Sequence, residues 1–305
     1  MSTKKITNTL LFTLILAFNL NAQINRVNIN SPCLAGCDGS TWALAYTSLK
    51  GAIDNTTTGE IWVAQGTYIP DAANRDSSFI LKNNVALYGG FIGTETTRNQ
   101  RNYTNNITIL SGDLSGNDGA SFANYTENSY HVVRATKVDN TAILDGFTIQ
   151  SGNANAITFP DYIGGGLYND GEGAGNSSIP IVQNCHFTLN FADRSGGAIF
   201  NYGGTSGNAN MSILNTQFTL NYSDDGGALY NDGQGFGQAN PIVEGCYFAA
   251  NTAINGGAIY NYGIAVGNSN PTIVNTLIIG NKADRGGAMY NDGSAVGNAN
   301  GNIVN

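Results

Sequence analysis

Residues 226–255 read GGALYNDGQGFGQANPIVEGCYFAANTAIN, and residues 256–285 read GGAIYNYGIAVGNSNPTIVNTLIIGNKADR. Each block opens with a Gly-Gly pair and places an asparagine three residues after an apolar residue, Phe248 in the first block and Ile278 in the second. Self-similarity at a fixed step of about thirty residues is typical of repeat architectures, in which each repeat contributes one structural unit. The repeat therefore decides the fold.

The same block recurs over residues 161–305. Gly-Gly pairs follow one another at steps of 32, 30, 30 and 30 residues, beginning at Gly164, Gly196, Gly226, Gly256 and Gly286. The asparagine of the second motif recurs at Asn190, Asn221, Asn251 and Asn281. A loop similar to GNAN keeps the same step and begins at Gly207, Gly237, Gly267 and Gly297.

Each repeat holds three short apolar stretches separated by Asn, Asp and Gly; in one repeat they are Ala228–Tyr230, Ile242–Val243 and Cys246–Phe248. They are too short for stable helices and rich in aromatic and β-branched residues, which favours strands. Stacked repeats pair each strand with its counterpart about 4.8 Å away. We therefore predict a parallel β-helix with three strands per coil. The recurring asparagines should form an internal hydrogen-bonded ladder, and the Gly pairs should allow positive φ or close approach of coils.

Residues 23–160 are less regular, and we interpret them as an N-terminal cap followed by irregular coils of the same solenoid. Trp42, Tyr46, Leu49 and Ile53 recur at helical spacing behind Ser40 and Thr41, which predicts an amphipathic helix that covers the open end. Strands are expected at Ile61–Val63, Val85–Tyr88, Ile107–Leu110, His131–Val133 and Ile143–Ile149. No linker is visible, so we expect one domain. The sequence stops at Asn305, part-way through a coil, which predicts an open strand edge prone to association.

The N-terminus predicts export. Lys4 and Lys5 precede an apolar run from Leu10 to Phe18, and Ala22 offers a cleavage point, so residues 1–22 are interpreted as a signal peptide. The run is shorter than the roughly 20 residues that cross a bilayer, and no membrane-spanning segment is expected in the mature chain. Without Lys4 and Lys5 the chain has 11 basic and 21 acidic residues. This charge of −10 argues against nucleic-acid partners.

The four cysteines divide into two pairs. Cys185 and Cys246 occupy the same repeat position two coils apart, about 9.6 Å, which exceeds the roughly 7 Å limit for a disulfide, so both should be free, packed thiols. Cys33 and Cys37 are close enough to bridge around a turn. For these two, a disulfide is favoured over metal binding, which would require further ligands.

The alternation of GGA plus an aliphatic residue with FxxN resembles the repeat of the chlamydial polymorphic outer membrane proteins, surface-displayed β-helices of the pectin-lyase-like superfamily. The segments Ile61–Tyr68, Tyr88–Phe91, Gly93–Glu95 and Leu110–Asp113 are similar to the opening of bacterial surface proteins that carry such repeats. The resemblance implies right-handed coiling and a secreted or cell-surface, outer-membrane-associated location. It does not fix the function, because the superfamily includes polysaccharide-cleaving enzymes and non-catalytic adhesins.

Several acidic residues are candidates for metal or catalytic sites. Asp170, Asp232 and Asp292 recur only on every second coil, about 9.6 Å apart, which is too far for neighbours to share one Ca²⁺, so we interpret them as turn residues. Asp224 and Asp225 resemble the paired acids of β-helix glycosidases, but the companion motifs Gly-His-Gly and Arg-Ile-Lys are absent. A cross-coil ion pair with Arg194 is the expected role.

The remaining candidates have simpler interpretations. His131 and His186 lack a second imidazole at metal spacing and are expected to be solvated or at the core edge. Arg98, Arg101 and Asp113 flank a long loop and are expected to close it through charge pairs.

No catalytic, cofactor-binding or metal-ligating residue is therefore assigned, and no cofactor is expected. We expect a non-enzymatic, structural or adhesin-like protein whose partners are glycans or surface proteins. The alternative is a carbohydrate-active enzyme, a polysaccharide lyase or glycoside hydrolase, whose catalytic coil lies in the irregular N-terminal half or beyond Asn305. From Gly164 onward the sequence has nine acidic and three basic residues. Such a surface would repel a polyanion, so we expect no cleavage of acidic glycans.

Overall fold

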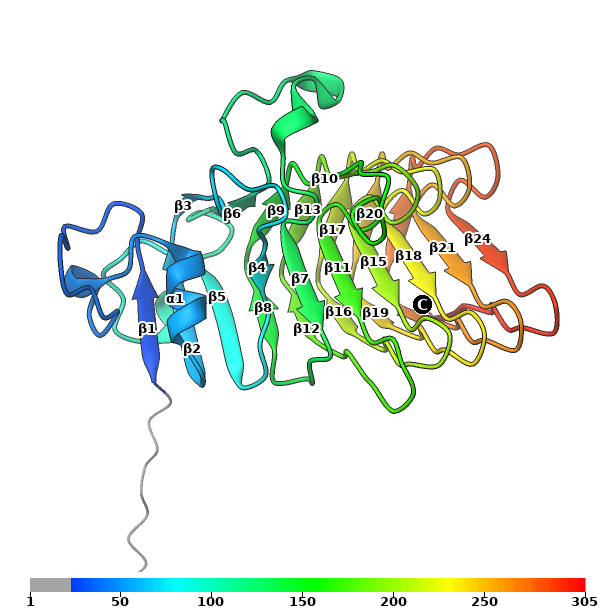
Figure 1. The fold of residues 1–305 in the computed structure, drawn as a ribbon, viewed down its shortest axis with the longest axis horizontal. Coiled ribbons are helices and arrows are strands. Elements are labelled where there is room, and N and C mark those ends of the chain that lie inside the picture. Colours follow the sequence, from blue (N-terminus) through cyan, green and yellow to red (C-terminus); the bar gives the residue numbers. More distant parts are fainter. Residues whose placement is uncertain (1–22, 305) are drawn as a thin grey trace, which may run out of the picture.

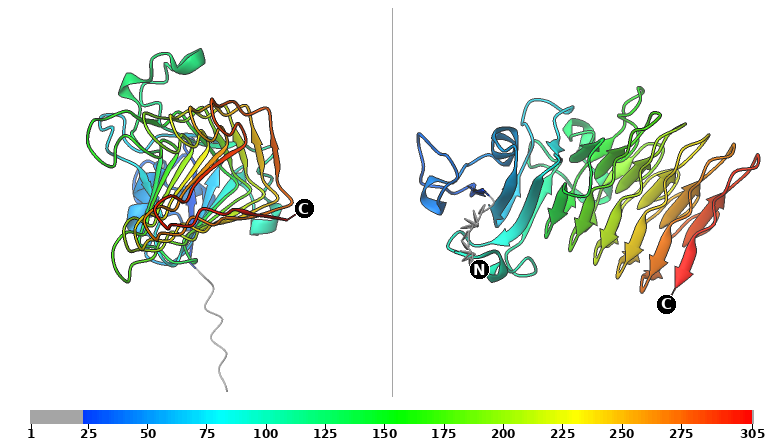
Figure 2. Two further views of the ribbon diagram at one scale, coloured as in Figure 1. Left: turned by 90° about the vertical axis from the view of Figure 1, so that its right-hand side faces the viewer. Right: turned by 90° about the horizontal axis from the view of Figure 1, so that it is seen from below.

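The structure is a computed structural model that describes residues 23–304; the signal peptide expected over residues 1–22 lies outside them. The chain winds as a right-handed parallel β-helix along one axis (Figure 1), as the sequence predicted. Seen along the axis, the coils superpose around a common interior (Figure 2). Among the described residues, no helix has the length and apolar character needed to cross a membrane.

Three parallel sheets form the sides of the β-helix in residues 23–304. Sheet 1 contains, in spatial order, β1 (Ile24–Val27), β2 (Gly59–Ala64), β5 (Val85–Phe91), β8 (Ile143–Asp145), β12 (Ile181–Gln183), β16 (Ser212–Leu214), β19 (Ile242–Glu244), β22 (Thr272–Val274) and β25 (Asn302–Val304). Sheet 2 contains β3 (Gly66–Tyr68), β6 (Thr108–Ser111), β9 (Thr148–Gln150), β13 (His186–Thr188), β17 (Gln217–Thr219), β20 (Tyr247–Ala249) and β23 (Leu277–Ile279).

Sheet 3 contains β4 (Phe79–Ile80), β7 (Val133–Thr136), β11 (Leu167–Asp170), β15 (Ile199–Tyr202), β18 (Leu229–Asp232), β21 (Ile259–Tyr262) and β24 (Met289–Asp292). A shorter pair, β10 (Asn153–Ala154) and β14 (Phe191–Ala192), lies at a corner between sheets 2 and 3. Each regular coil passes through sheets 3, 1 and 2 in turn, as β18, β19 and β20 do. β23, β24 and β25 form the last edge of the described residues; association through that edge stays a prediction.

The core is built from residues that stack on their own repeat equivalents. Phe218 pairs with Phe187 on one side and Phe248 on the other, with ring centroids 5.3 and 4.5 Å apart. All three rings are buried. Stacked aromatic pairs add to the free energy gained by burying their area. The phenylalanine of each FxxN motif is thus a core residue, and Ile278, its equivalent in the next coil, is partly buried against this core.

The predicted asparagine ladder is present. From Asn190 to Asn281, each side-chain Nδ2 donates to Oδ1 of the next asparagine at 3.0, 2.9 and 2.8 Å. A second ladder, which the sequence analysis did not predict, follows the Asn of each GGALYND-type motif on sheet 3. Its four bonds measure 2.7, 3.2, 2.8 and 2.7 Å and join Asn169, Asn201, Asn231, Asn261 and Asn291.

The Gly-Gly pairs have both of the expected roles. Gly226 has φ of 61°, a left-handed conformation that residues with a Cβ rarely adopt. A Cβ on Gly227 would lie 2.5 Å from the carbonyl oxygen of Gly257 in the next coil. The first glycine makes the corner, and the second lets the coils approach.

The N-terminal helix is shorter than predicted. The chain forms a 3-10 turn, η1 (Trp42–Leu44), and then a separate helix, α1 (Leu49–Asn55), whose N-cap is Ser48. Between them, Tyr46 forms backbone hydrogen bonds to Arg26 and Asn28 along β1, which ends the helical path. α1 contacts β4, the strand at the N-terminal edge of sheet 3, and Leu49, Ala52 and Ile53 are buried. It is therefore the expected capping helix.

The stretch Ile143–Ile149, expected as one strand, is split between β8 and β9 because Gly146, at φ 82°, turns the chain from sheet 1 to sheet 2. Cys185 and Cys246 are free and buried, and Cys33 is bonded to Cys37. The cysteine predictions are confirmed.

Asn221→Ala should destabilise the protein by roughly 2–5 kcal/mol, because it leaves buried donors and acceptors without partners. The Asn221 oxygen accepts from the backbone and side-chain nitrogens of Asn190, and its Nδ2 donates to Phe187 and Asn251. Urea unfolding followed by circular dichroism measures the change. The exposed Asn300→Ala serves as control and should stay within about 0.5 kcal/mol of the wild type; equal effects of the two variants would contradict a stabilising ladder.

Candidate functional site

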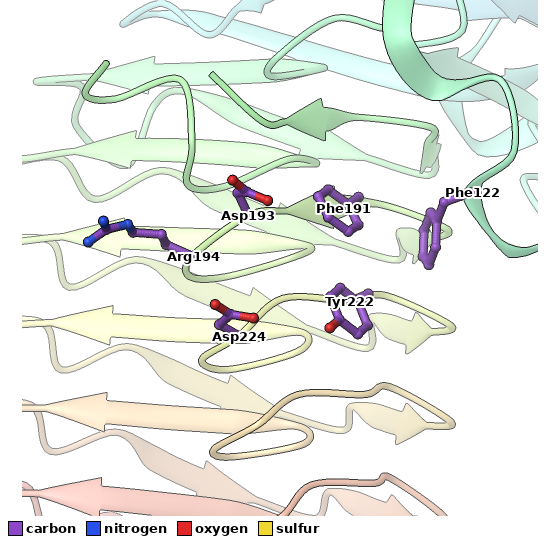
Figure 3. A pocket seen from close by; sticks show the side chains of 6 residues that line it. All are labelled: Phe122, Phe191, Asp193, Arg194, Tyr222 and Asp224. Carbon is purple, nitrogen blue, oxygen red and sulfur yellow. The ribbon is translucent and has the colours of Figure 1, made fainter. Parts of the chain in front are cut away.

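Three aromatic side chains meet in a cleft of about 370 Å³ on the corner between sheets 2 and 3. Phe191 belongs to β14, Tyr222 occupies the equivalent position in the next coil, and Phe122 comes from the loop between β6 and β7 (Figure 3). That loop contains two 3-10 turns, η3 (Ala120–Phe122) and η4 (Tyr125–Glu127). The cleft is thus formed where an irregular loop meets the regular coils.

The rings of the cleft form a compact group. Phe191 and Tyr222 are stacked with centroids 5.3 Å apart and planes 7° from parallel. Phe122 presents its ring edge-on to Phe191 at 5.5 Å and lies 6.2 Å from Tyr222. All three are half-buried, so part of each ring remains accessible.

These aromatic residues break the repeat. The column through this corner runs Asn153, Phe191, Tyr222, Thr252 and Lys282, so only two neighbouring coils carry a ring here. Residues needed by every coil recur in every coil, as the ladder asparagines do. The rings of Phe191 and Tyr222 occur in two coils only, so the stacking of coil on coil does not require them. Such an exception is where a function added to the scaffold is expected.

Charged groups line the same cleft at equivalent positions. Asp193 and Asp224 each follow the ring of their coil by two residues. Burial raises the pKa of Asp224, and the carboxylates of Asp225 and Asp193 raise it further, while Arg194 opposes them. In Figure 3 the Arg194 side chain points away from the rings.

The prediction of an ion pair between Arg194 and Asp224 or Asp225 is wrong. Within residues 23–304 no such pair lies within 4.0 Å. The guanidinium lies 5.3 Å from the ring centre of Tyr162, and Asp225 accepts a hydrogen bond of 2.7 Å from Asn255 Nδ2. Arg194 therefore contacts the Tyr162 ring, and Asp225 contacts the Asn255 amide, in place of the predicted ion pair. Asp224 remains directed toward the cleft.

A second cleft of about 510 Å³ adjoins the first and shares Arg194 and Asp224 with it. It continues along the outer face of sheet 3, where its lining includes Tyr230, Tyr260 and Tyr262. Because the two clefts share these residues they adjoin, and together they are called the groove; the residues that line it come from several neighbouring coils. Rings and carboxylates spread over several coils fit a chain-like ligand better than a compact one.

The alternating row of acids and tyrosines on sheet 3 has the predicted register: Asp232 pairs with Tyr202 on one side and Tyr262 on the other. Each aspartate accepts a hydrogen bond from the backbone nitrogen two residues on, which closes its own turn; the three are Asp170, Asp232 and Asp292. The interpretation as turn residues is therefore confirmed. Asp232 alone among them is buried, and burial raises its pKa to about 7.

The two histidines are held by ordinary contacts. His131 is buried rather than solvated: its Nδ1 lies 2.9 Å from the Gly164 carbonyl oxygen, and its Nε2 lies 3.3 Å from Asp161 Oδ1. His186 is half-buried, with Nε2 2.7 Å from Thr219 Oγ1, and burial lowers its pKa. Neither histidine belongs to a group of metal-ligating side chains in the described part of the chain.

The charged loop residues behave largely as expected. Arg98 pairs with Glu60, and Arg101 lies 2.7 Å from the carboxylate of Asp145, so both tie the loop after β5 to strands of sheet 1. Asp113 differs, because its carboxylate accepts backbone N–H groups of its own loop instead of pairing with an arginine.

No protein-family model matches the chain, and no curated protein matches its sequence. Among solved structures, the crystal structure of the pectin methylesterase from Aspergillus niger in deglycosylated form matches with a TM-score of 0.42 and 14% identity. The match covers 92% of this chain and 84% of the esterase. At this level of similarity, nothing about activity is transferred.

The aromatic cleft was not predicted from the sequence. A signal was present, because Phe191 and Tyr222 directly follow the ladder residues Asn190 and Asn221, whereas Thr252 and Lys282 follow the next two. No comparable signal exists for Phe122, which reaches the cleft from a loop outside the repeat.

Stability should depend on pH through Asp232. Its pKa is about 7 in the fold and about 3.9 in the unfolded chain, so between these values only the folded state retains the proton. Stability should therefore fall as pH rises from about 4 to 7 and then level off. Asp232→Asn should remove this contribution and be more stable than the wild type at pH 8 by roughly 1–4 kcal/mol.

Urea unfolding at intervals from pH 4 to 8 measures the effect. Asp292→Asn, a change at the same repeat position in the last described coil, where the carboxylate is not buried, is the matched control. Parallel profiles for the wild type and Asp232→Asn would refute a raised pKa at this carboxyl.

Proposed function

We propose that this chain is a secreted or cell-surface β-helix protein that binds glycan chains, in an adhesin-like role, through the groove that begins at Phe122, Phe191 and Tyr222. The observation that carries the proposal is the aromatic group restricted to two neighbouring coils. Ligand clefts commonly combine apolar ring faces with a few polar groups, and here the rings offer surfaces for the C–H faces of sugars. Asp193 and Asp224 offer acceptors for sugar hydroxyls.

The charge of the groove supports a neutral glycan. The cleft carries two carboxylates, Asp193 and Asp224, and one cation, Arg194, whose guanidinium lies over Tyr162. From Gly164 onward, nine acidic residues oppose three basic ones. A uronic-acid polymer would be repelled by this surface.

The exported, outer-membrane-associated location belongs to the same proposal. It is supported by the N-terminal run of Lys4, Lys5 and Leu10–Phe18 and by the GGA and FxxN repeats. Their resemblance to polymorphic outer membrane proteins supports a bacterial surface protein.

One observation favours the alternative, a carbohydrate-active enzyme. Asp224 has a raised pKa and shares the cleft with Asp193. Glycoside hydrolases use two carboxylates, of which the acid has its pKa raised by its surroundings. Asp224→Asn separates the two functions, because it would abolish hydrolysis while leaving the stacking rings in place.

Tyr222→Ala should weaken binding of neutral oligosaccharides about tenfold, the effect of losing roughly 1.4 kcal/mol of stacking. Cello-, xylo- and manno-oligosaccharides are screened against the mature chain, and the tightest is titrated by calorimetry. Tyr247→Ala removes an exposed ring from the outer face of sheet 2 and should leave affinity unchanged. Polygalacturonate should be neither bound nor cleaved.

Equal affinity of the wild type and Tyr222→Ala, or no binding of any neutral oligosaccharide, would exclude the proposed groove. Product release by the wild type that disappears in Asp224→Asn would make the enzyme the better assignment.

A further inference from the structure

Three carboxylates converge at the base of the loop between β6 and β7, the green segment that projects at the top of Figure 1. Asp113, Asp118 and Glu127 each offer one oxygen, and these oxygens all lie within 4.8 Å of one another. Oxygen ligands bind Ca²⁺ at about 2.4 Å, so two ligands of one ion lie at most about 4.8 Å apart. The spacing fits a single ion.

A second observation at the same place concerns buried oxygens. Asp118 Oδ1, Glu127 Oε1 and Asn128 Oδ1 are shielded from solvent, and none has a hydrogen-bond partner in the structure. Asn128 is 0% exposed, and its Nδ2 donates to Asp118 Oδ2 at 2.9 Å, so its amide lies beside the cluster. Buried acceptors without donors are rare in folded proteins because desolvation is costly. Two of these oxygens belong to carboxylates of the cluster, which calls for a positive charge there.

The protein supplies no such charge here. No lysine or arginine within residues 23–304 lies within 4.0 Å of the three carboxylates. Burial raises the pKa of Asp118, hydrogen bonds with the side chains of Ser151 and Asn128 oppose this shift, and the carboxylates of Asp113 and Glu127 add to it. Asp113 is partly compensated, because its oxygens accept the backbone N–H groups of Ser115, Gly116, Asn117 and Asp118.

We propose that Asp113, Asp118 and Glu127, beside the buried amide of Asn128, bind a calcium ion. All three ligands are carboxylates, oxygen donors that a hard divalent cation prefers. Asp113, Ser115 and Asn117 alternate like the first three ligand positions of an EF-hand loop. The loop is nevertheless not an EF-hand, because Asp118 and Asn124 occupy the positions of its glycine and its twelfth-place glutamate.

The ion would hold the segment that carries Phe122. Ser121, Phe122 and Asn124 have φ of 56°, 61° and 65°, a conformation that residues other than glycine adopt rarely. Phe122 packs edge-on to Tyr125 and Phe191, and the Asn124 Nδ2 donates to the Asn117 carbonyl oxygen at 2.9 Å. The Tyr125 hydroxyl donates to the Leu189 carbonyl oxygen at 3.2 Å. A cation joining Asp113, Asp118 and Glu127 would tie both ends of the segment together. This role does not depend on the identity of any glycan.

The test is Ca²⁺ binding by the mature chain after removal of metal with a chelator. Calorimetry should show one Ca²⁺ per chain, with Kd of about 10⁻³ M or tighter, the range of extracellular calcium modules. Tb³⁺ should bind at the same place and show luminescence sensitised by Tyr125, which Ca²⁺ displaces. Asp118→Asn and Glu127→Gln should each weaken binding at least tenfold.

Asp139→Asn is the matched control, because Asp139 is an exposed turn carboxylate bonded to Thr141 and should leave the Ca²⁺ affinity unchanged. Circular dichroism checks that each variant is folded. Absence of both the calorimetric and the Tb³⁺ signal in the wild type would overturn the site. Undiminished binding by both loop variants would place the ion elsewhere and overturn it equally. Loss of oligosaccharide binding with intact Ca²⁺ binding would refute only the glycan groove.

Discussion

The structure depends on one constraint, the stacking of each residue on its own equivalent in the next coil. Parallel strands about 4.8 Å apart bring identical side chains into contact, so a residue is stable only if it interacts well with a copy of itself. Asparagine satisfies this condition, because its amide donates to one neighbour and accepts from the other; Asn221 does both, at 2.9 and 3.0 Å. Phenylalanine satisfies it by ring stacking. An aspartate repeated in every coil would not, since like charges would be stacked, and the tyrosines on either side of Asp232 avoid this.

This constraint explains which features could be predicted from the sequence. The ladder from Asn190 to Asn281, the three strands per coil and the free thiols of Cys185 and Cys246 all follow from the repeat period. The second ladder was missed because asparagine beside aspartate and glycine is equally typical of a turn. The predicted capping helix was longer than the observed one, because the hydrogen bonds between Tyr46 and the β1 segment cannot be inferred from helical spacing.

The candidate site follows the opposite logic, because it is formed by exceptions to the repeat. Phe191 and Tyr222 interrupt a column that continues as Thr252 and Lys282, and the interruption is visible in the sequence alone. Phe122 joins them from nearly seventy residues earlier, through a loop whose path no periodicity determines. The Arg194 contact was also mispredicted, because the ring of Tyr162 in the preceding coil competes with the neighbouring carboxylates. Residues that depart from the repeat therefore decide the shape of the cleft.

An acidic chain with few cations must compensate each buried carboxylate separately, and residues 23–304 show several ways of doing so. Asp145 pairs with Arg101 and accepts the amides of Gln183 and Asn184. Glu95 accepts three backbone N–H groups, from Ile92, Gly93 and Thr94. The pKa of Asp232 is raised to about 7, so protonation removes much of its charge near neutrality. Asp118 and Glu127 each have a shielded oxygen with none of these partners, and they lie close to a third carboxylate. A bound cation would compensate them together, and it would lie at the base of the loop that forms one wall of the cleft.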